Sequence, residues 1–210
     1  MVLDLLTVAV LAFVGTRLFS GARQVVRPEV RAHVVGIVRG IRLRHVVLAP
    51  LVLALVIATY TGLDLVPPLR WGWWTAIGGQ GNPAVGVTDS TTGSALEWIV
   101  PVVFLVMLLP ALPLFAEREE HMFRLGAESW STGRRIGRGL QFGLVHAVIG
   151  IPIAAALALS VGGWYFTAMY LRAWRRTNDA EAAVLESTRA HLTYNLEVLV
   201  LVVVALLFGL

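Results

Sequence analysis

The sequence predicts an all-α fold: a polytopic transmembrane helix bundle with about six membrane-crossing helices and amphipathic cytoplasmic segments. Of the 210 residues, 57% are hydrophobic and 14% are charged, whereas soluble domains carry about 25% charged residues. The mean hydropathy is +0.76, and the apolar runs approach the roughly 20 residues needed to cross a bilayer. Arginines gather between these runs, where positive charge orients membrane proteins. We therefore expect residues 1–210 to form a single integral membrane domain.

The first half of the chain predicts three spans. Residues 2–18 are apolar without a basic leader or a small-residue cleavage pattern, so we expect a transmembrane helix there rather than a signal peptide. The arginine-rich connection 21–45 is expected at the cytoplasmic interface. Residues 45–65 and 95–115 predict the next two spans, and the loop between them should face outside, because it carries no positive charge after Arg70. Three prolines should kink or end the third helix: Pro101, Pro110 and Pro113.

The apolar run 140–171 is too long for one crossing, because a single helix of this length would extend about 48 Å. Basic residues on both flanks indicate an even number of crossings. We expect two short helices that turn near Ser160, Gly162 and Gly163, since small residues favour turns. The polar stretch 175–190 predicts a cytoplasmic helix, and residues 191–210 predict the last span.

The composition argues against several classes of function. The chain contains no cysteine, which excludes disulfides, thiol nucleophiles and thiolate metal sites. The net charge of +4 could suggest nucleic-acid binding, but the arginines lie between apolar runs in the pattern of membrane topology. We therefore expect a lipid bilayer, and no nucleic acid, among the partners.

Three polar clusters lie in or beside the predicted spans. Ionisable groups there cost on the order of 2.5–3.5 kcal/mol on insertion scales, so they mark candidate functional sites. Each cluster contains side chains one helical turn apart on one face. They are Glu119, Glu120 and Arg124; Phe142 and His146; and His191 and Asn195. The predicted topology places all three at or just below the cytoplasmic face, where they could line one water-filled cavity between helices.

The three clusters resemble the motifs EExxxR, FxxxH and HxxxN of the CAAX protease and bacteriocin-processing (CPBP) family of membrane proteins. In that family the motifs occur in this order on separate helices. One such motif arises easily by chance, whereas three in this order on one side of a polytopic membrane protein are specific. The resemblance covers about residues 110–200, the motif-bearing core. It implies a multi-pass protein of a bacterial plasma (inner) membrane with its site facing the cytoplasm.

The resemblance also implies an intramembrane endopeptidase in which a glutamate activates water for attack on a peptide bond. Glu119 would be the general base. His146 would orient the water, and His191 and Asn195 would donate hydrogen bonds to the oxyanion. Three further residues would support the site by charge pairing or packing: Glu120, Arg124 and Phe142. The substrate would be a peptide or a membrane-protein segment.

No cofactor is expected in this mechanism. A zinc-dependent alternative uses the same residues, because two histidines and a carboxylate can form a hydrolytic zinc triad. Its ligands would be Glu119, His146 and His191. No compact zinc motif such as HExxH is present, so spacing gives the zinc alternative no separate support.

A non-catalytic role is the main alternative function. Some members of the resembled family are similar to scaffolds or immunity factors, and here Leu125 follows Arg124 where the family commonly has glycine. The polar site would then hold helices together or bind a membrane-protein partner. A transporter is less favoured, because it would place polar residues near the bilayer midplane rather than toward one face.

Overall fold

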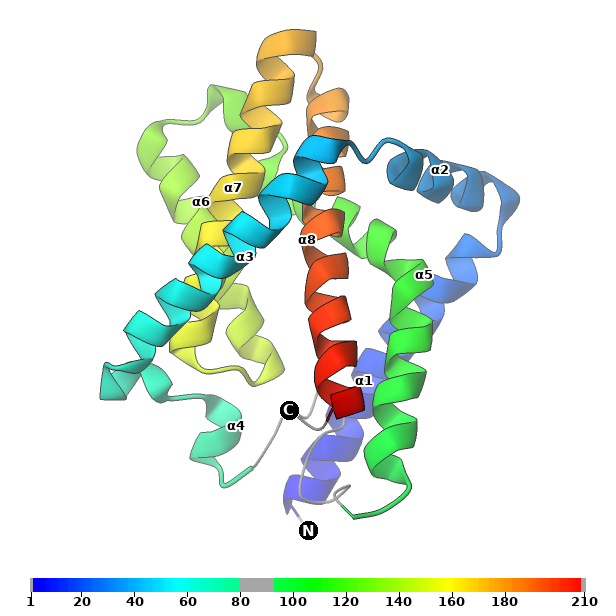
Figure 1. Cartoon of the computed structure of the whole chain (residues 1–210), viewed down its shortest axis with the longest axis vertical. Helices are drawn as coiled ribbons and strands as arrows, with labels where there is room; N and C mark the ends of the chain where they lie inside the picture. The colour runs from blue at the N-terminus through cyan, green and yellow to red at the C-terminus, as the bar shows by residue number, and fades with distance from the viewer. Residues whose placement is uncertain (1, 80–92, 209–210) are drawn as a thin grey trace.

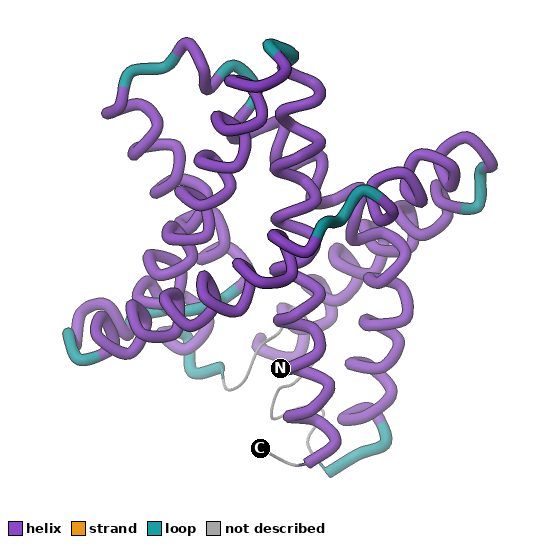
Figure 2. The backbone as a smooth tube through the Cα atoms, turned by 45° about the horizontal axis from the view of Figure 1, so that its top comes forward, coloured by secondary structure: helices purple, strands orange, loops and turns teal. Residues whose placement is uncertain are grey.

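The computed structural model describes residues 2–79 and 93–208, and every regular element in these ranges is helical (Figures 1 and 2). The long helices are α1 (Val2–Val25), α3 (Leu43–Asp64), α5 (Leu96–Arg124), α7 (Ile153–Thr177) and α8 (Ala180–Phe208). The shorter ones are α2 (Pro28–Arg39), α4 (Trp73–Ala76) and α6 (Thr132–Val145). The prediction of an all-α protein is confirmed for the described residues.

Four of the described helices are long and apolar enough to cross a membrane, namely α1, α3, α5 and α7. This is the architecture of a membrane protein, as predicted. The predicted total of about six crossings is not confirmed. Helix α6 has 14 residues, which corresponds to only about 21 Å. Residues 80–92 of the predicted outer loop lie outside the described residues.

Helix α7 lies at the centre of one group of helices and packs against α3, α6 and α8 (Figure 1). Helix α1 packs against α5, and α5 in turn contacts α8. The turned view in Figure 2 shows the same two groups with α8 between them. The largest apolar core among the described residues joins α3, α5, α6, α7 and α8 and includes Leu53, Phe123, Phe142 and Phe166. Helix α8 therefore connects the motif of α5 with the core around α7.

Helix α5 continues through all three of its prolines to Arg124, so they do not end it. Membrane helices tolerate proline where neighbouring groups satisfy the freed backbone carbonyls, and Pro101 and Pro113 are buried in the bundle. The helix also runs nine residues beyond the predicted end at residue 115. Glu119, Glu120 and Arg124 are thus held on the rigid C-terminal turns of a spanning helix.

The predicted turn near Ser160, Gly162 and Gly163 is wrong, because all three residues lie inside α7. The chain reverses earlier, between the end of α6 at Val145 and the start of α7 at Ile153. Gly150 has a φ of 93°, a left-handed conformation that glycine adopts without steric cost. Pro152 directly precedes the first residue of α7, and its fixed φ suits the approach to a helix.

The small residues of α6 and α7 allow close packing of the two helices. A Cβ atom on Gly143 would collide with the carbonyl oxygen of Ala156 and the hydroxyl of Ser160. A Cβ atom on Gly163 would lie 2.9 Å from the carbonyl oxygen of Gly139. Small residues let helix backbones approach closely in membrane proteins. The sequence signal that suggested a turn therefore marks a helix interface.

The predicted cytoplasmic helix 175–190 and the predicted last span are not separate elements. Helix α7 ends at Thr177, and Asn178 has a φ of 52°. The carboxylate of Asp179 then accepts hydrogen bonds from the backbone N–H groups of Glu181 and Ala182, which caps the start of α8. Helix α8 continues unbroken from Ala180 to Phe208. Its polar first half and apolar second half consequently form one rigid rod.

Candidate active site

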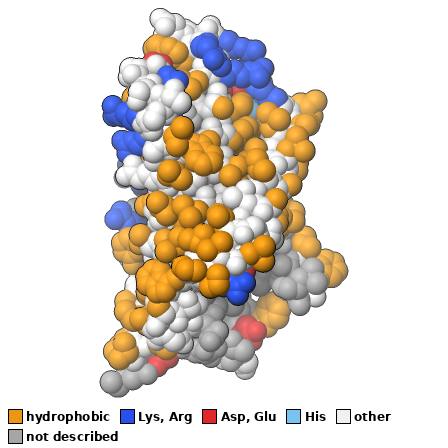
Figure 3. Space-filling view, turned by 90° about the vertical axis from the view of Figure 1, so that its left-hand side faces the viewer, with side chains coloured by type: hydrophobic (Ala, Val, Ile, Leu, Met, Phe, Trp, Pro, Cys, Tyr) orange, Lys and Arg blue, Asp and Glu red, His pale blue; other side chains and the backbone are white. Residues whose placement is uncertain are grey.

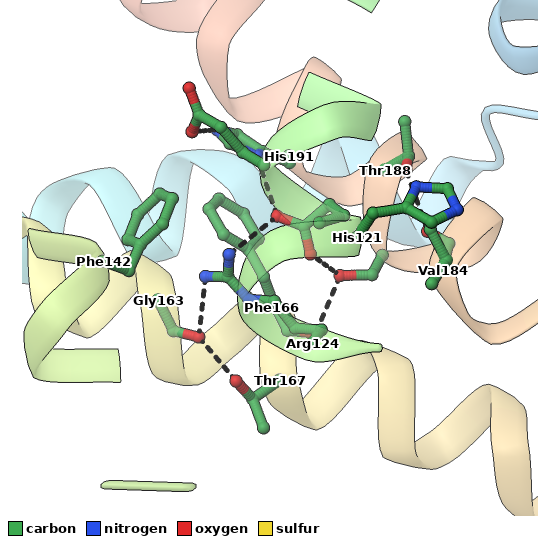
Figure 4. Close-up of polar contacts among 12 residues, drawn as sticks. His121, Arg124, Phe142, Gly163, Phe166, Thr167, Val184, Thr188 and His191 are labelled. Atoms are coloured by element: carbon green, nitrogen blue, oxygen red, sulfur yellow. Dashed lines mark hydrogen bonds and ion pairs between the residues drawn. The ribbon is translucent and has the colours of Figure 1, made fainter. Parts of the chain in front are cut away.

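A buried polar cluster between α5, α7 and α8 contains Arg124, His191 and the carbonyl of Gly163 (Figure 4). The carboxylate of Glu120 lies at its centre. Nη1 of Arg124 lies 3.2 Å from its Oε1, and Nδ1 of His191 lies 2.9 Å from the same oxygen. The hydroxyl of Ser187 donates a hydrogen bond to Oε2. Glu120 is 0% exposed. Its negative charge is therefore compensated by groups from two helices rather than by water.

Arg124 is the second fully buried charge of the cluster, with 1% exposure. Its Nη2 donates a hydrogen bond of 3.2 Å to the carbonyl oxygen of Gly163 on α7. The guanidinium carbon lies 4.2 Å from the ring centroid of Phe142 and 5.5 Å from that of Phe166. Such ring faces attract cations. Arg124 thereby connects α5 to α6 and α7 in the core of the bundle.

His191 is held by contacts on its face and on both ring nitrogens. Its ring stacks on Phe166 with a centroid distance of 4.3 Å and an interplanar angle of 20°. Nδ1–H donates to Glu120, and Nε2 lies 3.8 Å from Oε2 of Glu119. The side chain of Glu119 is 36% exposed, whereas that of His191 is 4% exposed. The cluster therefore opens to solvent at Glu119.

Direct contacts join six of the seven predicted site residues, but His146 contacts only Phe142 among them. Nδ1–H of His146 donates to the carbonyl oxygen of Phe142 at 2.8 Å, one turn back along the chain. The ring of Phe142 lies between the two imidazoles, with its centroid 5.1 Å from that of His146 and 5.5 Å from that of His191. His146 thus reaches the cluster through Phe142.

Asn195 lies one turn beyond His191 on α8. Its amide is half-buried and makes no hydrogen bond with any residue in the described ranges. The spacing of four residues does place it on the same helix face as His191.

Sequence reasoning missed Ser187, Phe166 and Gly163. Ser187 donates to Glu120 and to the carbonyl oxygen of Phe166, which lies 3.0 Å from its hydroxyl. A signal for Ser187 exists, because it lies four residues before His191 and so shares its helix face. No sequence pattern marks Phe166 or the carbonyl of Gly163 as partners of this cluster, since both contacts arise from how α7 packs against α5 and α8.

The donors of the zinc alternative do not converge. Within the ranges that the structure describes, no three His, Asp or Glu side chains lie close enough together to hold a metal ion. Glu119 and His191 are neighbours, but Phe142 separates His146 from them. Nδ1 of His191 is already bonded to Glu120. The arrangement suits proton transfer between a carboxylate and an imidazole better than a three-ligand metal site.

Comparisons with protein-family models, with curated proteins and with solved structures give no match to this chain. The chemistry of the site is therefore inferred from its own geometry.

A second acidic residue, Glu186, precedes Ser187 on α8 and faces α3. Its Oε1 accepts hydrogen bonds from the guanidinium of Arg44 and from Nε2–H of His45, at 2.8 Å for the histidine. Burial raises the pKa of the Glu186 carboxyl, but the bonds from His45 and Arg44 outweigh this effect and lower its pKa to about 2. Glu186 consequently fastens the start of α3 to α8.

We expect Glu186 to make the protein less stable to unfolding at acidic pH. A carboxyl whose pKa is lowered on folding contributes stability above its unfolded pKa, and this contribution is lost as the pH falls through the folded pKa. For Glu186 that window runs from 4.5 down to about 2. Thermal unfolding of wild type and Glu186→Gln in detergent measures it: the difference in midpoint should be constant near neutral pH and shrink below about pH 4.5. A difference that stays constant down to about pH 3 would contradict the assignment.

Proposed function

We propose that the protein is an intramembrane endopeptidase similar to the CPBP family, which hydrolyses a peptide or membrane-protein segment near the cytoplasmic face of the plasma membrane. In this proposal the remaining two of about six crossings are α8 and α6 as extended by the 3₁₀ turn His146–Ile149. One observation carries the proposal: Oε2 of the half-exposed Glu119 lies 3.8 Å from Nε2 of His191, whose Nδ1 is fixed by the buried Glu120. This pairing supports acid–base chemistry at Glu119, whose side chain is 36% exposed.

Glu119 is the general base of the proposed reaction. The distance of 3.8 Å exceeds a direct hydrogen bond, and both atoms can bond to one water molecule. Glu119 removes a proton from this water while the oxygen of the water attacks the carbonyl carbon of the peptide bond. The protonated Glu119 then delivers the proton to the leaving nitrogen as the C–N bond breaks. The products are a carboxyl group and a free amine, with no metal ion in the sequence of steps.

His191 and Asn195 stabilise the oxyanion in this proposal. The bond from Nδ1–H of His191 to Glu120 fixes the ring orientation. In this proposal Nε2 of His191 also carries a proton, and it donates a hydrogen bond to the developing negative charge, as does the amide of Asn195 one turn away. Ser187 and Arg124 hold Glu120 in place from the opposite sides. His146 contacts Phe142 and neither Glu119 nor His191, so in this proposal it acts on the site only by holding the Phe142 ring.

We expect Glu119→Gln to lower peptide cleavage about a hundredfold, the lower end of what a general base contributes. The amide keeps the shape of the side chain but accepts no proton. The measurement uses purified protein in detergent or vesicles, with a peptide library and co-purifying membrane proteins as substrates and mass spectrometry as the readout.

Glu117→Gln is the matched control, because Glu117 lies on the same stretch of α5 but pairs with His33 at a distance of 2.9 Å. Its activity should equal that of wild type. A zinc chelator should also leave cleavage unchanged. Equal activity of the Glu119 and Glu117 variants would refute the proposed base, and inhibition by the chelator would favour the zinc alternative.

A non-catalytic partner-binding role is the second candidate, favoured by the nearly complete burial of Glu120, Arg124 and His191. A buried cluster of this kind can have a purely structural role, which is to join α5, α7 and α8. In that case Glu119→Gln would preserve both the cellular phenotype and the co-purification of a membrane-protein partner. Loss of the phenotype without loss of folding would favour the endopeptidase.

A further inference from the structure

A basic cavity lies at the end of the bundle where α3 begins and α7 passes into α8. Its volume is about 250 Å³. Five arginines line it, four from α3, α7 and α8 and one from the residue before α3: Arg44, Arg172, Arg176, Arg189 and Arg42. The lining contains one carboxylate, that of Glu186. This cavity is separate from the Glu120 cluster and has no part in the proposed hydrolysis.

Positive charge in this cavity is only partly compensated. Glu186 already bonds to Arg44 and His45, and Nη1 of Arg189 lies 3.8 Å away from its other oxygen. Nε of Arg189 is buried without a hydrogen-bond partner. Burial lowers the pKa of Arg189, Glu186 raises it, and the like charges of Arg42 and Arg44 lower it again. The cavity thus favours an anion with several acceptor oxygens.

An apolar groove between α3 and α7 adjoins the basic cavity. Both helices line it with residues at the spacing i, i+3, i+4 and i+7. These are Leu48, Leu51, Val52 and Leu55 on α3, and Tyr165, Ala168, Met169 and Arg172 on α7, with Arg175 beside them. Arg172 lines both the groove and the cavity. Figure 3 shows this side of the molecule, with arginine side chains gathered toward its upper end and hydrophobic side chains spread below them.

We infer that the cavity and the groove together bind one anionic phospholipid, with the phosphate headgroup among the arginines and an acyl chain between α3 and α7. Guanidinium groups bind phosphate oxygens in a bidentate manner, and basic pockets at the ends of membrane helices suit anionic headgroups. A soluble phosphate would satisfy the arginines but leave the groove unexplained. The groove is apolar and exposed, with Leu51 63% and Leu55 56% accessible, as expected of a surface that an acyl chain covers.

Native mass spectrometry of the detergent-solubilised protein, titrated with phosphatidylglycerol or phosphatidylcholine, tests this inference. We expect tighter binding of phosphatidylglycerol. Arg172→Gln/Arg176→Gln should weaken it about twenty-five-fold, because each arginine near an anionic headgroup strengthens binding about fivefold. Ala168→Trp fills the groove and should weaken binding about tenfold, the effect of displacing roughly two methylene groups from apolar surface.

The matched control is Arg31→Gln/Arg39→Gln, which removes two exposed arginines of α2 that do not line the cavity. It should bind phosphatidylglycerol as wild type does. Lipid affinities are compared between variants with equal thermal unfolding midpoints, or after correction for the folded fraction of each variant. Equal affinity for the two lipids, or equal losses in both double variants, would overturn the site. The site would also be overturned if millimolar inorganic phosphate displaced the lipid completely and Ala168→Trp had no effect. That result would show that the arginines bind a soluble anion instead of a phospholipid.

Discussion

Replacing Glu120 with alanine should destabilise the fold by about 3–5 kcal/mol, the cost of leaving one member of a buried ion pair alone. Arg124 is 1% exposed and would keep its charge with only the carbonyl of Gly163 and aromatic rings as partners. His191 and Ser187 would each lose their bond to the same carboxylate. Titration with a denaturing detergent measures the change in the free energy of unfolding.

Glu117→Ala is the control, since Glu117 lies three residues earlier on α5 and pairs with the exposed His33. Such surface pairs contribute about 0–1 kcal/mol. The double variant Glu120→Leu/Arg124→Met should recover part of the loss, because it removes both buried charges together. If Glu120→Ala is no less stable than Glu117→Ala, the cluster does not hold α5 against α7 and α8.

Glu186 and Ser187 connect the two polar sites of the protein. They are consecutive on α8 and so point in different directions around the helix, about 100° apart. Glu186 faces the arginine cavity at the start of α3, and Ser187 bonds to Glu120 in the candidate active site. A bound headgroup that repositions Glu186 would therefore act on the same turn of α8 that orients Glu120. The lipid titration and the cleavage assay measure the two sites separately.

The part of the site that could be predicted is the part that helix geometry alone determines. Residues four apart share a helix face in any fold, and this relation holds for Glu120 with Arg124 and for Phe142 with His146. The contact of His191 with Glu120 needed a further condition, the packing of α5 against α8. The separation of His146 by Phe142 depends on how α6 is rotated, which no spacing in the sequence reveals.

The same distinction explains the errors in the predicted fold. The apolar runs predicted where α1, α3 and α5 lie, because span length is set by the bilayer. Glycine has two structural uses, in turns and in close helix contacts, and composition does not distinguish them. Gly163 therefore suggested a turn but serves packing, whereas Gly150 makes the actual turn. The sequence changes from polar to apolar near residue 190, and this change suggested a boundary between two helices. In the structure α8 continues through it.

The close packing of α6 on α7 leads to the last prediction, for Gly143→Ala. The new Cβ atom would collide with the carbonyl oxygen of Ala156 and the hydroxyl of Ser160, and would lie 2.7 Å from the backbone nitrogen of Ser160. Backbone atoms cannot rotate away, so we expect a loss of about 3 kcal/mol, the upper end of the usual cost of overpacking. Because Phe142 precedes Gly143, a shifted α6 should also disturb the ring that contacts Arg124 and both imidazoles.

Gly137→Ala on the same helix provides the comparison, since a Cβ atom there would meet nothing within 4 Å. It should stabilise the protein by up to about 1 kcal/mol through the higher helix propensity of alanine. The same substitution at two glycines of α6 therefore has opposite expected signs in the free energy of unfolding, measured by denaturing-detergent titration. If both variants are stabilised, α6 and α7 do not pack as closely as in the structure. The position of Phe142 in the candidate site would then be wrong as well.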